Sequence, residues 1–502
     1  MPQRVLTDRD SDIVGPPPLR HGLAAPVPTI KILLYTDDPD DVVPYEDDRK
    51  DLGLFKMLEH LKAREPASAK FSTKWVSRNS SNQTHADQKL HDGLEAERQT
   101  GHPFDEIWFF GIHQANKRKF SNGVFRGGFE SELTENEVSA LRLWMDAGGG
   151  VLMAGDHGHP RPDDTLPSTN PGCPGLADAP FLGRGRALGR CVPRAGLLRT
   201  WEGKPTNESQ DSNNTIANSG LDTDQVPQQL FHVKVDANGE PDNNGQPHTI
   251  FSYKPDRWIE FLPDHLHEGE VVEPQNLDSN LWPNQIKPYV VAHSFDSQHA
   301  KPVNLLVTYN GDLANVGRIV ADSSWHHYFN VNVSPFRHPA APDSPADQIG
   351  QFYANLAIWL SGRSLRKNMA LAMLWRLATY TALMEPLGDV RNIGKSANSI
   401  LLQVASTCEI REIIQAMVPA RYGMLPFVPG AATLSHLPSQ ELLLGCILDS
   451  YHNEMIRDET SDESYVPLEV DEVIEKGFIR ALEDHLSQLE ALATETRNLI
   501  DR

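Results

Sequence analysis

The chain has 502 residues, more than one hydrophobic core usually supports, so a large domain and a smaller one are expected. Its formal net charge of -22 disfavours a nucleic-acid partner, because a negative surface repels a phosphate backbone. The mean hydropathy is -0.44, and no apolar run approaches the roughly 20 residues that a bilayer span needs. The composition therefore excludes a membrane protein.

The beginning of the chain and its cysteines both favour a cytoplasmic location. Residues 1–28 are rich in Pro, Asp and Arg and lack the apolar segment of a signal peptide, so they are expected to form a flexible N-terminal arm. The four cysteines lack the paired spacing of a disulfide framework or a zinc ribbon. We interpret them as small buried hydrophobic residues; they are Cys173, Cys191, Cys408 and Cys446.

Apolar runs alternate with helical patterns from residue 29 to about residue 155. Buried strands are predicted over residues 29–36, 70–77, 105–112 and 151–154. A helix is predicted over residues 133–147, where Thr134 and Glu137 have the spacing of a capping box. Such alternation predicts an α/β fold with a flavodoxin-like, mostly parallel sheet and helices on both of its faces.

A long insertion follows, from about residue 160 to about residue 300. It is rich in Pro, Asn, Asp and Gly and has only short strand-like pieces, so part of it is expected to cover a site as a lid and part to be mobile. Five arginines between residues 184 and 199 form its one basic stretch. They could face an anionic ligand, although a solvated loop is the simpler interpretation.

The sheet pattern resumes at residues 302–309 and 317–322, and a helix near residues 346–360 closes a domain that spans residues 29–362. Residues 363–502 are expected to form a helical C-terminal domain with a final amphipathic helix. Its apolar faces make it the candidate surface for a protein partner or for self-association. Those faces comprise Leu371, Leu374 and Leu377, and Ile479, Leu482, Leu486 and Leu489.

Acidic and histidine side chains follow several of the predicted strands. Ligands of open parallel sheets bind outside the carboxyl ends of the strands, so these residues are expected to converge on one pocket for a small molecule. Singly, each Asp could cap a helix and each His could be an ordinary loop residue. The residues are Asp37, Asp38, Asp40 and Asp41; His113; Asp156, His157 and His159; and Asp322, His326 and His327.

Three chemical interpretations of this pocket stay open. In the first, Asp156, His157 and His159 bind a divalent metal such as zinc, with His326 or His327 as a further ligand. In the second, one of these histidines is a general acid or base oriented by Asp322, without a metal. The third is a binding site without chemistry. Asp37, Asp38 and His113 are the candidate ligand-binding residues, and His157 is a further catalytic candidate.

A polar cluster inside the insertion, LPDHLHEGE, is a candidate lid segment. It contains His265, His267 and Glu268. In an extended strand the two histidines face the same side and could chelate a metal. A polar loop is the alternative, and a lid that folds back over the sheet would bring this cluster to the pocket.

The segments GGGVLMAGDHG and GRIVADSSWHH resemble the class I glutamine amidotransferase-like superfamily, especially its ThuA-like branch. The resemblance covers about residues 30–155 and 302–362. In amidotransferases a nucleophilic Cys lies on the turn after the strand that matches residues 151–154, whereas here the turn reads GDHG, so glutamine hydrolysis through a thiolate is not expected. The catalytic His of these enzymes corresponds to His326 or His327.

ThuA-like proteins also lack the Cys and are associated with sugar utilisation. The resemblance therefore implies a hydrolase-like enzyme that acts on a small polar molecule, such as a sugar derivative. The long insertion and the helical C-terminal domain depart from a minimal ThuA-like protein. The alternative is a non-catalytic module that senses a ligand or binds a protein through a degenerate amidotransferase-like fold.

Overall fold

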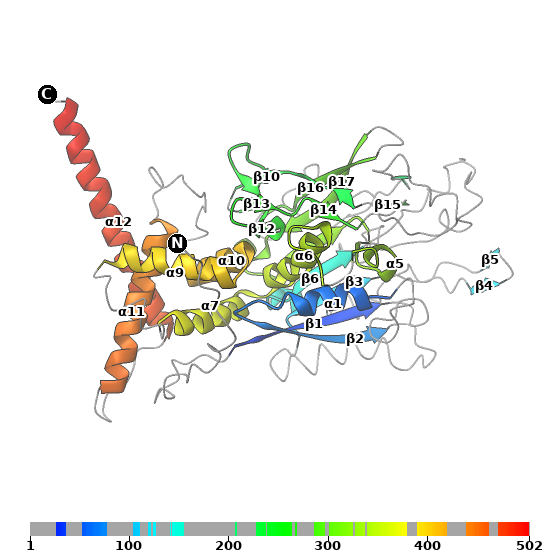
Figure 1. Cartoon of the computed structure of the whole chain (residues 1–502), viewed down its shortest axis with the longest axis horizontal. Helices are drawn as coiled ribbons and strands as arrows, with labels where there is room; N and C mark the ends of the chain where they lie inside the picture. The colour runs from blue at the N-terminus through cyan, green and yellow to red at the C-terminus, as the bar shows by residue number, and fades with distance from the viewer. Residues whose placement is uncertain are drawn as a thin grey trace. The chain divides into compact units, whose positions relative to one another are not determined.

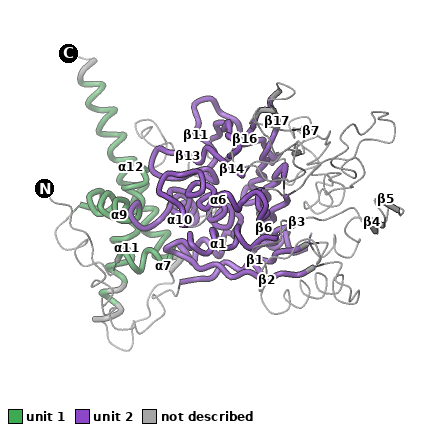
Figure 2. The backbone as a smooth tube through the Cα atoms, turned by 45° about the vertical axis from the view of Figure 1, so that its right-hand side comes forward, with its two compact units in different colours: residues 1–26, 370–401, 436–502 green, residues 27–369, 402–435 purple. Residues whose placement is uncertain are grey.

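The computed structural model describes residues 27–36, 53–77, 104–110, 119–121, 124–126, 141, 143–154, 206–207, 227–236, 238–263, 267–268, 286–296, 301–324, 327–336, 339–378, 389–418, 438–460 and 470–500. The chain divides into two compact units (Figure 2). Unit 2 comprises residues 27–369 and 402–435, and unit 1 comprises residues 1–26, 370–401 and 436–502. The domain boundaries expected from the sequence stay a prediction.

Unit 2 is built on an eight-stranded sheet with the order β2-β1-β3-β6-β18-β17-β16-β9 (Figure 1). Neighbouring strands are parallel from β2 to β18 and antiparallel from β18 to β9. The prediction of an α/β fold with a mostly parallel sheet is thus confirmed. The strands are β1 (Thr29–Thr36), β2 (Lys70–Ser77), β3 (Glu106–Phe110), β6 (Gly150–Ala154), β9 (Phe231–His232), β16 (Tyr289–Asp296), β17 (Lys301–Tyr309) and β18 (Ile319–Asp322).

Both faces of this sheet are buried. On one face, side chains of β1, β3 and β6 form a core with Leu141, Trp144 and Met145, which belong to the helix predicted before β6. On the other face lie α1 (Phe55–Ala63) and α6 (Pro345–Leu360), which pack against each other. Every residue of β3 and β6 is buried, as expected for parallel strands between two layers of helices.

The glycines before β6 permit a close approach of main chains. Gly148 has φ +101° and ends the preceding helix in a conformation that favours glycine. A Cβ atom on Gly150 would lie 2.1 Å from the main-chain oxygen of Leu360, at the end of α6. Glycine is therefore needed at this position for the strand to pass the helix end.

The insertion contributes to the main sheet and also forms small two-stranded sheets. Both β9 and β16 come from residues 160–300, so the insertion supplies the two strands at one end of the sheet. Its two-stranded pairs are β7 (Thr206–Asn207) with β15 (His267–Glu268), β8 (Gln228–Gln229) with β14 (Phe261–Leu262), β10 (Lys234–Val235) with β11 (Gln246–Pro247), and β12 (Ser252–Lys254) with β13 (Arg257–Trp258). A further pair, β4 (Lys119–Ser121) with β5 (Val124–Arg126), precedes the insertion. Short helical turns are η5 (Thr249–Phe251), η9 (Gly311–Ala314) and α5 (Asn330–Val333).

The chain after α6 is helical wherever it is described as regular structure, as expected. Its helices are α7 (Arg363–Ala378), α9 (Val390–Val404), α10 (Thr407–Met417), α11 (Gln440–Thr460) and α12 (Val470–Ile500). Helix α10 belongs to unit 2, and the hydroxyl of Ser406 caps its N-terminus by accepting a hydrogen bond from the Glu409 main-chain N–H. Among the described helices, none combines the length and apolarity of a membrane span.

In unit 1, α11 and α12 pack against each other. The buried side of α12 carries Val473, Ile474, Phe478 and Ala481. The apolar face predicted from Ile479, Leu482, Leu486 and Leu489 is a different one, and it stays largely open: 38% of Ile479 and 54% of Leu486 is exposed. The sequence pattern identified a row of apolar residues on α12. The row that is buried within unit 1 is a different one.

Candidate functional site

Two of the predicted site residues have described side chains, Asp322 and His327. Both belong to the segment that ends β18 and leads to α5. His267 and Glu268 are described only as backbone of β15. The remaining predicted residues lie outside the described part of the chain: Asp37, Asp38, Asp40, Asp41, His113, Asp156, His157, His159, His265 and His326.

Asp322 is the last residue of β18, at the carboxyl end of the parallel strands, and its side chain is fully buried. His327 Nδ1 lies 2.7 Å from its Oδ1, and the Tyr328 hydroxyl donates to its Oδ2 at 2.8 Å. The main-chain N–H of Ser324 donates to Oδ1 at 3.1 Å. Three donors around a buried carboxylate satisfy its negative charge and fix its direction.

His327 is held from three directions, two at its ring and one at its main chain. Beyond its contact with Asp322, its Nε2 lies 2.9 Å from Oε1 of Gln228 in β8, and its main-chain oxygen accepts a hydrogen bond of 2.6 Å from the Tyr353 hydroxyl of α6. Both ring nitrogens therefore face an oxygen atom, and a neutral ring can donate a hydrogen bond to only one of them. The acidic partner on one side and the neutral amide on the other make the two nitrogens chemically distinct.

Gln228 was not predicted as a site residue. It belongs to the insertion, and its side chain is fully buried. A single glutamine in a polar segment gives no signal of its own in a sequence, and its partner His327 lies 99 positions away along the chain. Through Gln228, the insertion reaches the Asp322–His327 pair.

Aromatic rings enclose this pair. The ring centroids of Tyr328 and Phe110 are 5.1 Å apart, and those of Tyr328 and Tyr353 are 5.6 Å apart. Burial raises the pKa of the Tyr328 hydroxyl well above its usual value, and the negative charge of Asp322 raises this pKa further. Burial also raises the pKa of Tyr353. Both hydroxyls thus stay protonated and act as hydrogen-bond donors to the pair.

Ser323 follows Asp322 directly and is also buried. Its Oγ has no hydrogen-bond partner among the described residues. A buried hydroxyl without a partner is uncommon in a folded protein and is often satisfied by water or a ligand. At the end of β18, the Ser323 hydroxyl therefore has no hydrogen-bond partner among the described residues, whereas the neighbouring Asp322 carboxylate has three.

A metal site is not found among the described residues: within them, no group of three or more His, Cys, Asp and Glu side chains could hold an ion. The predicted ligands Asp156, His157 and His159 lie outside these residues. The zinc hypothesis stays a prediction. Asp322 and His327 alone are one carboxylate and one imidazole, which is fewer than the three protein ligands of a catalytic zinc.

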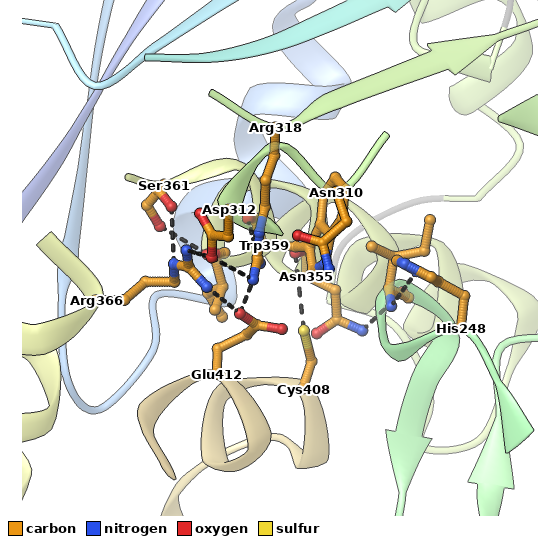
Figure 3. Close-up of polar contacts among 12 residues, drawn as sticks. His248, Asn310, Asp312, Arg318, Asn355, Trp359, Ser361, Arg366, Cys408 and Glu412 are labelled. Carbon is orange, nitrogen blue, oxygen red and sulfur yellow. Dashed lines mark hydrogen bonds and ion pairs between the residues drawn. The ribbon is translucent and has the colours of Figure 1, made fainter. Parts of the chain in front are cut away.

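A second buried polar cluster lies before the start of β18, and no residue of it was predicted as functional (Figure 3). Arg318 donates to Asp312 at 2.8 Å and to Glu412 of α10 at 2.6 Å. Arg366 of α7 contacts the same two carboxylates. Two guanidinium groups and two carboxylates balance in charge, so this cluster is a closed ion-pair network.

The field of the two arginines acts strongly on Asp312. Burial alone would raise the pKa of this carboxyl, but the charges of Arg318 and Arg366 outweigh burial and lower the pKa to about 2. The same arginine network makes a neutral histidine favourable nearby: burial and the charges of Arg318 and Arg411 lower the pKa of His248 to about 3. The lowered pKa of Asp312 stabilises the folded state at neutral pH, whereas the lowered pKa of His248 makes the folded state less stable as the pH falls below 6.5.

Cys408 lies beside this network, where its thiol is 3.9 Å from the main-chain oxygen of Asn355 (Figure 3). Burial raises the pKa of the Cys408 thiol, and the negative charge of Glu412 raises it further. A thiol of this kind is not a nucleophile at neutral pH. The prediction of buried cysteines is confirmed for Cys408 and Cys446, both of which are buried.

Comparison with protein-family models, with curated proteins and with solved structures gives no match to this chain.

Proposed function

We propose that unit 2 is a hydrolase-like enzyme that acts on a small polar molecule, with His327 as general acid or base and Asp322 as its positioning residue. The observation that carries this proposal is the 2.7 Å hydrogen bond between them at the carboxyl end of β18. Ligands of this class of sheet bind at that edge. A histidine oriented by a buried carboxylate is a recurrent arrangement for proton transfer in hydrolysis.

In the proposed reaction, His327 Nε2 exchanges a proton with the substrate or with water. The Gln228 amide occupies this nitrogen in the described state, at 2.9 Å, and a substrate hydroxyl or a water molecule would take its place. The ring accepts a proton from the attacking water and returns it to the leaving group, while the Asp322 carboxylate stabilises the positive ring in between. Tyr328 and the Ser324 N–H keep the carboxylate in place.

The insertion is proposed to act as a lid over this site, because Gln228 already belongs to it and contacts the catalytic ring. The lid residues His265, His267 and Glu268 come from the same segment. A divalent metal bound by Asp156, His157 and His159 would activate water for the same reaction. A sugar derivative is the proposed substrate class, on the strength of the resemblance to ThuA-like proteins, in which the late histidine corresponds to His326 or His327.

One observation favours the alternative of a non-catalytic, ligand-sensing module. Asp322, His327, Tyr328 and Gln228 are all fully buried, and their hydrogen bonds close on one another within the protein. A group that never leaves such an arrangement stabilises the fold without touching a substrate. The two proposals differ in whether a substrate or a water molecule replaces Gln228 at His327 Nε2.

The test is turnover of a panel of small esters, amides, lactones and glycosides by the purified full chain and by two His→Gln variants. His327→Gln removes the proposed acid–base group, and we expect a loss of about 10²-fold or more in turnover of any accepted substrate. His60→Gln is the matched control, because His60 is also buried, with its Nε2 2.6 Å from the main-chain oxygen of Phe336 and its ring 6.3 Å from that of Tyr353.

Full activity of His327→Gln would refute the catalytic role. If no panel member is converted while one binds the wild type, and binding is lost in Gln228→Leu, the sensing module is the correct function. Circular dichroism and thermal melts verify that each variant keeps its fold.

A further inference from the structure

Helix α12 has two separate apolar rows, and α11 accounts for one of them. Val473, Ile474, Phe478 and Ala481 are buried in unit 1, where α12 packs against α11. A second row begins at Ile479, on another side of the helix. From Leu486 to Asn498, every side chain except that of Leu489 is exposed.

The second row has the spacing of a coiled-coil seam. Its positions alternate by three and four residues, which is the a/d pattern of a heptad repeat with a period of 3.5 residues. The row consists of Ile479, Leu482, Leu486, Leu489, Ala493, Thr496 and Ile500. It covers about three heptads, or roughly 33 Å of helix, a length on which short coiled coils form.

The length of α12 also calls for a partner. Helix α11 has 21 residues and α12 has 31, so α12 is the longer helix by about 15 Å at the usual rise, and most of its side chains after His485 are exposed. A solvated helix of that length has little stability by itself, because most helical stability in proteins comes from packing of an apolar face. Leu486 and Leu492 are large apolar side chains on this part of the helix and are exposed by 54% and 51%.

The charges beside the seam suit a second copy of the same helix in parallel. One flank carries Glu483, Glu490 and Arg497. The other flank begins with Phe478 and His485, which are buried within unit 1, continues with Leu492 and Leu499, and has no Asp, Glu, Lys or Arg. In a parallel pair each flank meets the opposite flank of the partner, so no two like charges meet. An antiparallel pair would bring the acidic flanks together, with Glu490 close to a second glutamate.

We infer that the chain forms a homodimer in which the seams of two α12 helices pair in parallel. The occupant of the open face is a second copy of α12, and the contact is made chiefly from Leu486 onward, where the side chains of the helix up to Asn498, other than that of Leu489, are exposed. This inference does not depend on the proposed enzyme activity.

Sedimentation equilibrium of the full chain over a hundredfold range of concentration tests the dimer. We expect the wild type to approach twice the chain mass of 55.9 kDa, and Leu486→Glu/Ala493→Glu to stay at the single-chain mass. The matched control is Ser487→Glu/Thr494→Glu, which adds the same charges one residue further along and outside the seam. It should remain dimeric.

A wild type of single-chain mass at all concentrations overturns the inference, as does a seam variant that is as dimeric as its control. A second measurement covers the case in which the charged variant misfolds. Ala493→Cys places a thiol in the seam and should give a disulfide-linked dimer under mild oxidation, whereas Glu495→Cys, outside the seam, should not. Equal cross-linking of both variants, or of neither, contradicts the parallel seam.

Discussion

Strand β18 has a buried polar cluster at each of its two ends, and the clusters differ in kind. Before the strand, Arg318 and three charged partners satisfy one another as ion pairs. After the strand, the Asp322–His327 pair ends on a neutral amide, that of Gln228. In the first cluster the opposite charges balance within the protein, although Arg318 Nε has no hydrogen-bond partner among the described residues. In the second cluster the ring nitrogen Nε2 of His327 contacts a neutral group.

The comparison explains why buried charge by itself does not identify a functional site. Both clusters are buried and both contain carboxylates, but only one lies at the carboxyl edge of the parallel strands, where such folds bind ligands. The other joins η9, α7 and α10 to the beginning of β18 within unit 2. The position in the fold and the balance of charge therefore distinguish the structural cluster around Arg318 from the candidate site around His327.

The largest effect is expected from Glu412→Ala, which leaves both guanidinium groups with one carboxylate to share. Breaking a buried ion pair in this way costs about 3–5 kcal/mol of the free energy of unfolding, because an uncompensated charge stays buried. Urea unfolding measures the loss. The control is Glu59→Ala, which removes the half-exposed ion pair with Lys56 and should cost less than about 1 kcal/mol. Equal losses in both variants would mean that the network contributes nothing beyond a surface pair.

A smaller effect is expected from acid, through Asp312. Its pKa is lowered to about 2 in the folded state, so its contribution is fully present above pH 5 and is lost as the pH falls toward 2. A shift of this size corresponds to about 2.5 kcal/mol. Unfolding free energies measured from pH 6 downward should fall less steeply in Asp312→Asn than in the wild type. Parallel curves would show that the arginines do not favour the charged form of this carboxyl.

The smallest effect is expected at the other end of the strand, from Tyr328→Phe. This variant removes one of the three donors to Asp322 and keeps the ring, so we expect a loss of about 1–2 kcal/mol in the free energy of unfolding. Turnover of any accepted substrate should fall much less than in His327→Gln, because the proton path is untouched. A loss as large as that of His327→Gln would assign Tyr328 a direct part in the reaction.

Much of the sheet was predictable from sequence, because buried parallel strands are continuous apolar runs. The runs that were predicted as strands at residues 29–36 and 70–77 match β1 and β2 at both ends. The pairing of β9 with β16 was not predictable, since β9 is a strand of two residues in a polar segment. Short strands of this kind depend on their neighbours and not on a pattern of their own.

The candidate site was predictable only in part. The place of Asp322 after a strand and the presence of a histidine pair were visible, but the choice of His327 as its partner depends on the path of the loop. The ion pairs of Arg318 were not visible, because their members come from separate segments and look like ordinary surface charges in the sequence. Both clusters are formed by contacts between segments that are distant in the sequence, and a local sequence pattern does not reveal such contacts.

The place of β16 has a consequence for attempts to shorten the chain. Its pairing with β17 over Tyr289–Asp296 means that deletion of residues 160–300 would turn β17 into an edge strand. The main-chain N–H and C=O groups of this nine-residue strand, KPVNLLVTY, would then face solvent without partners. Long apolar edges of this kind recruit further strands from other molecules. On this side of the sheet the present edge strand is β9, which has two residues, so the deletion would replace a short edge strand with a long apolar one.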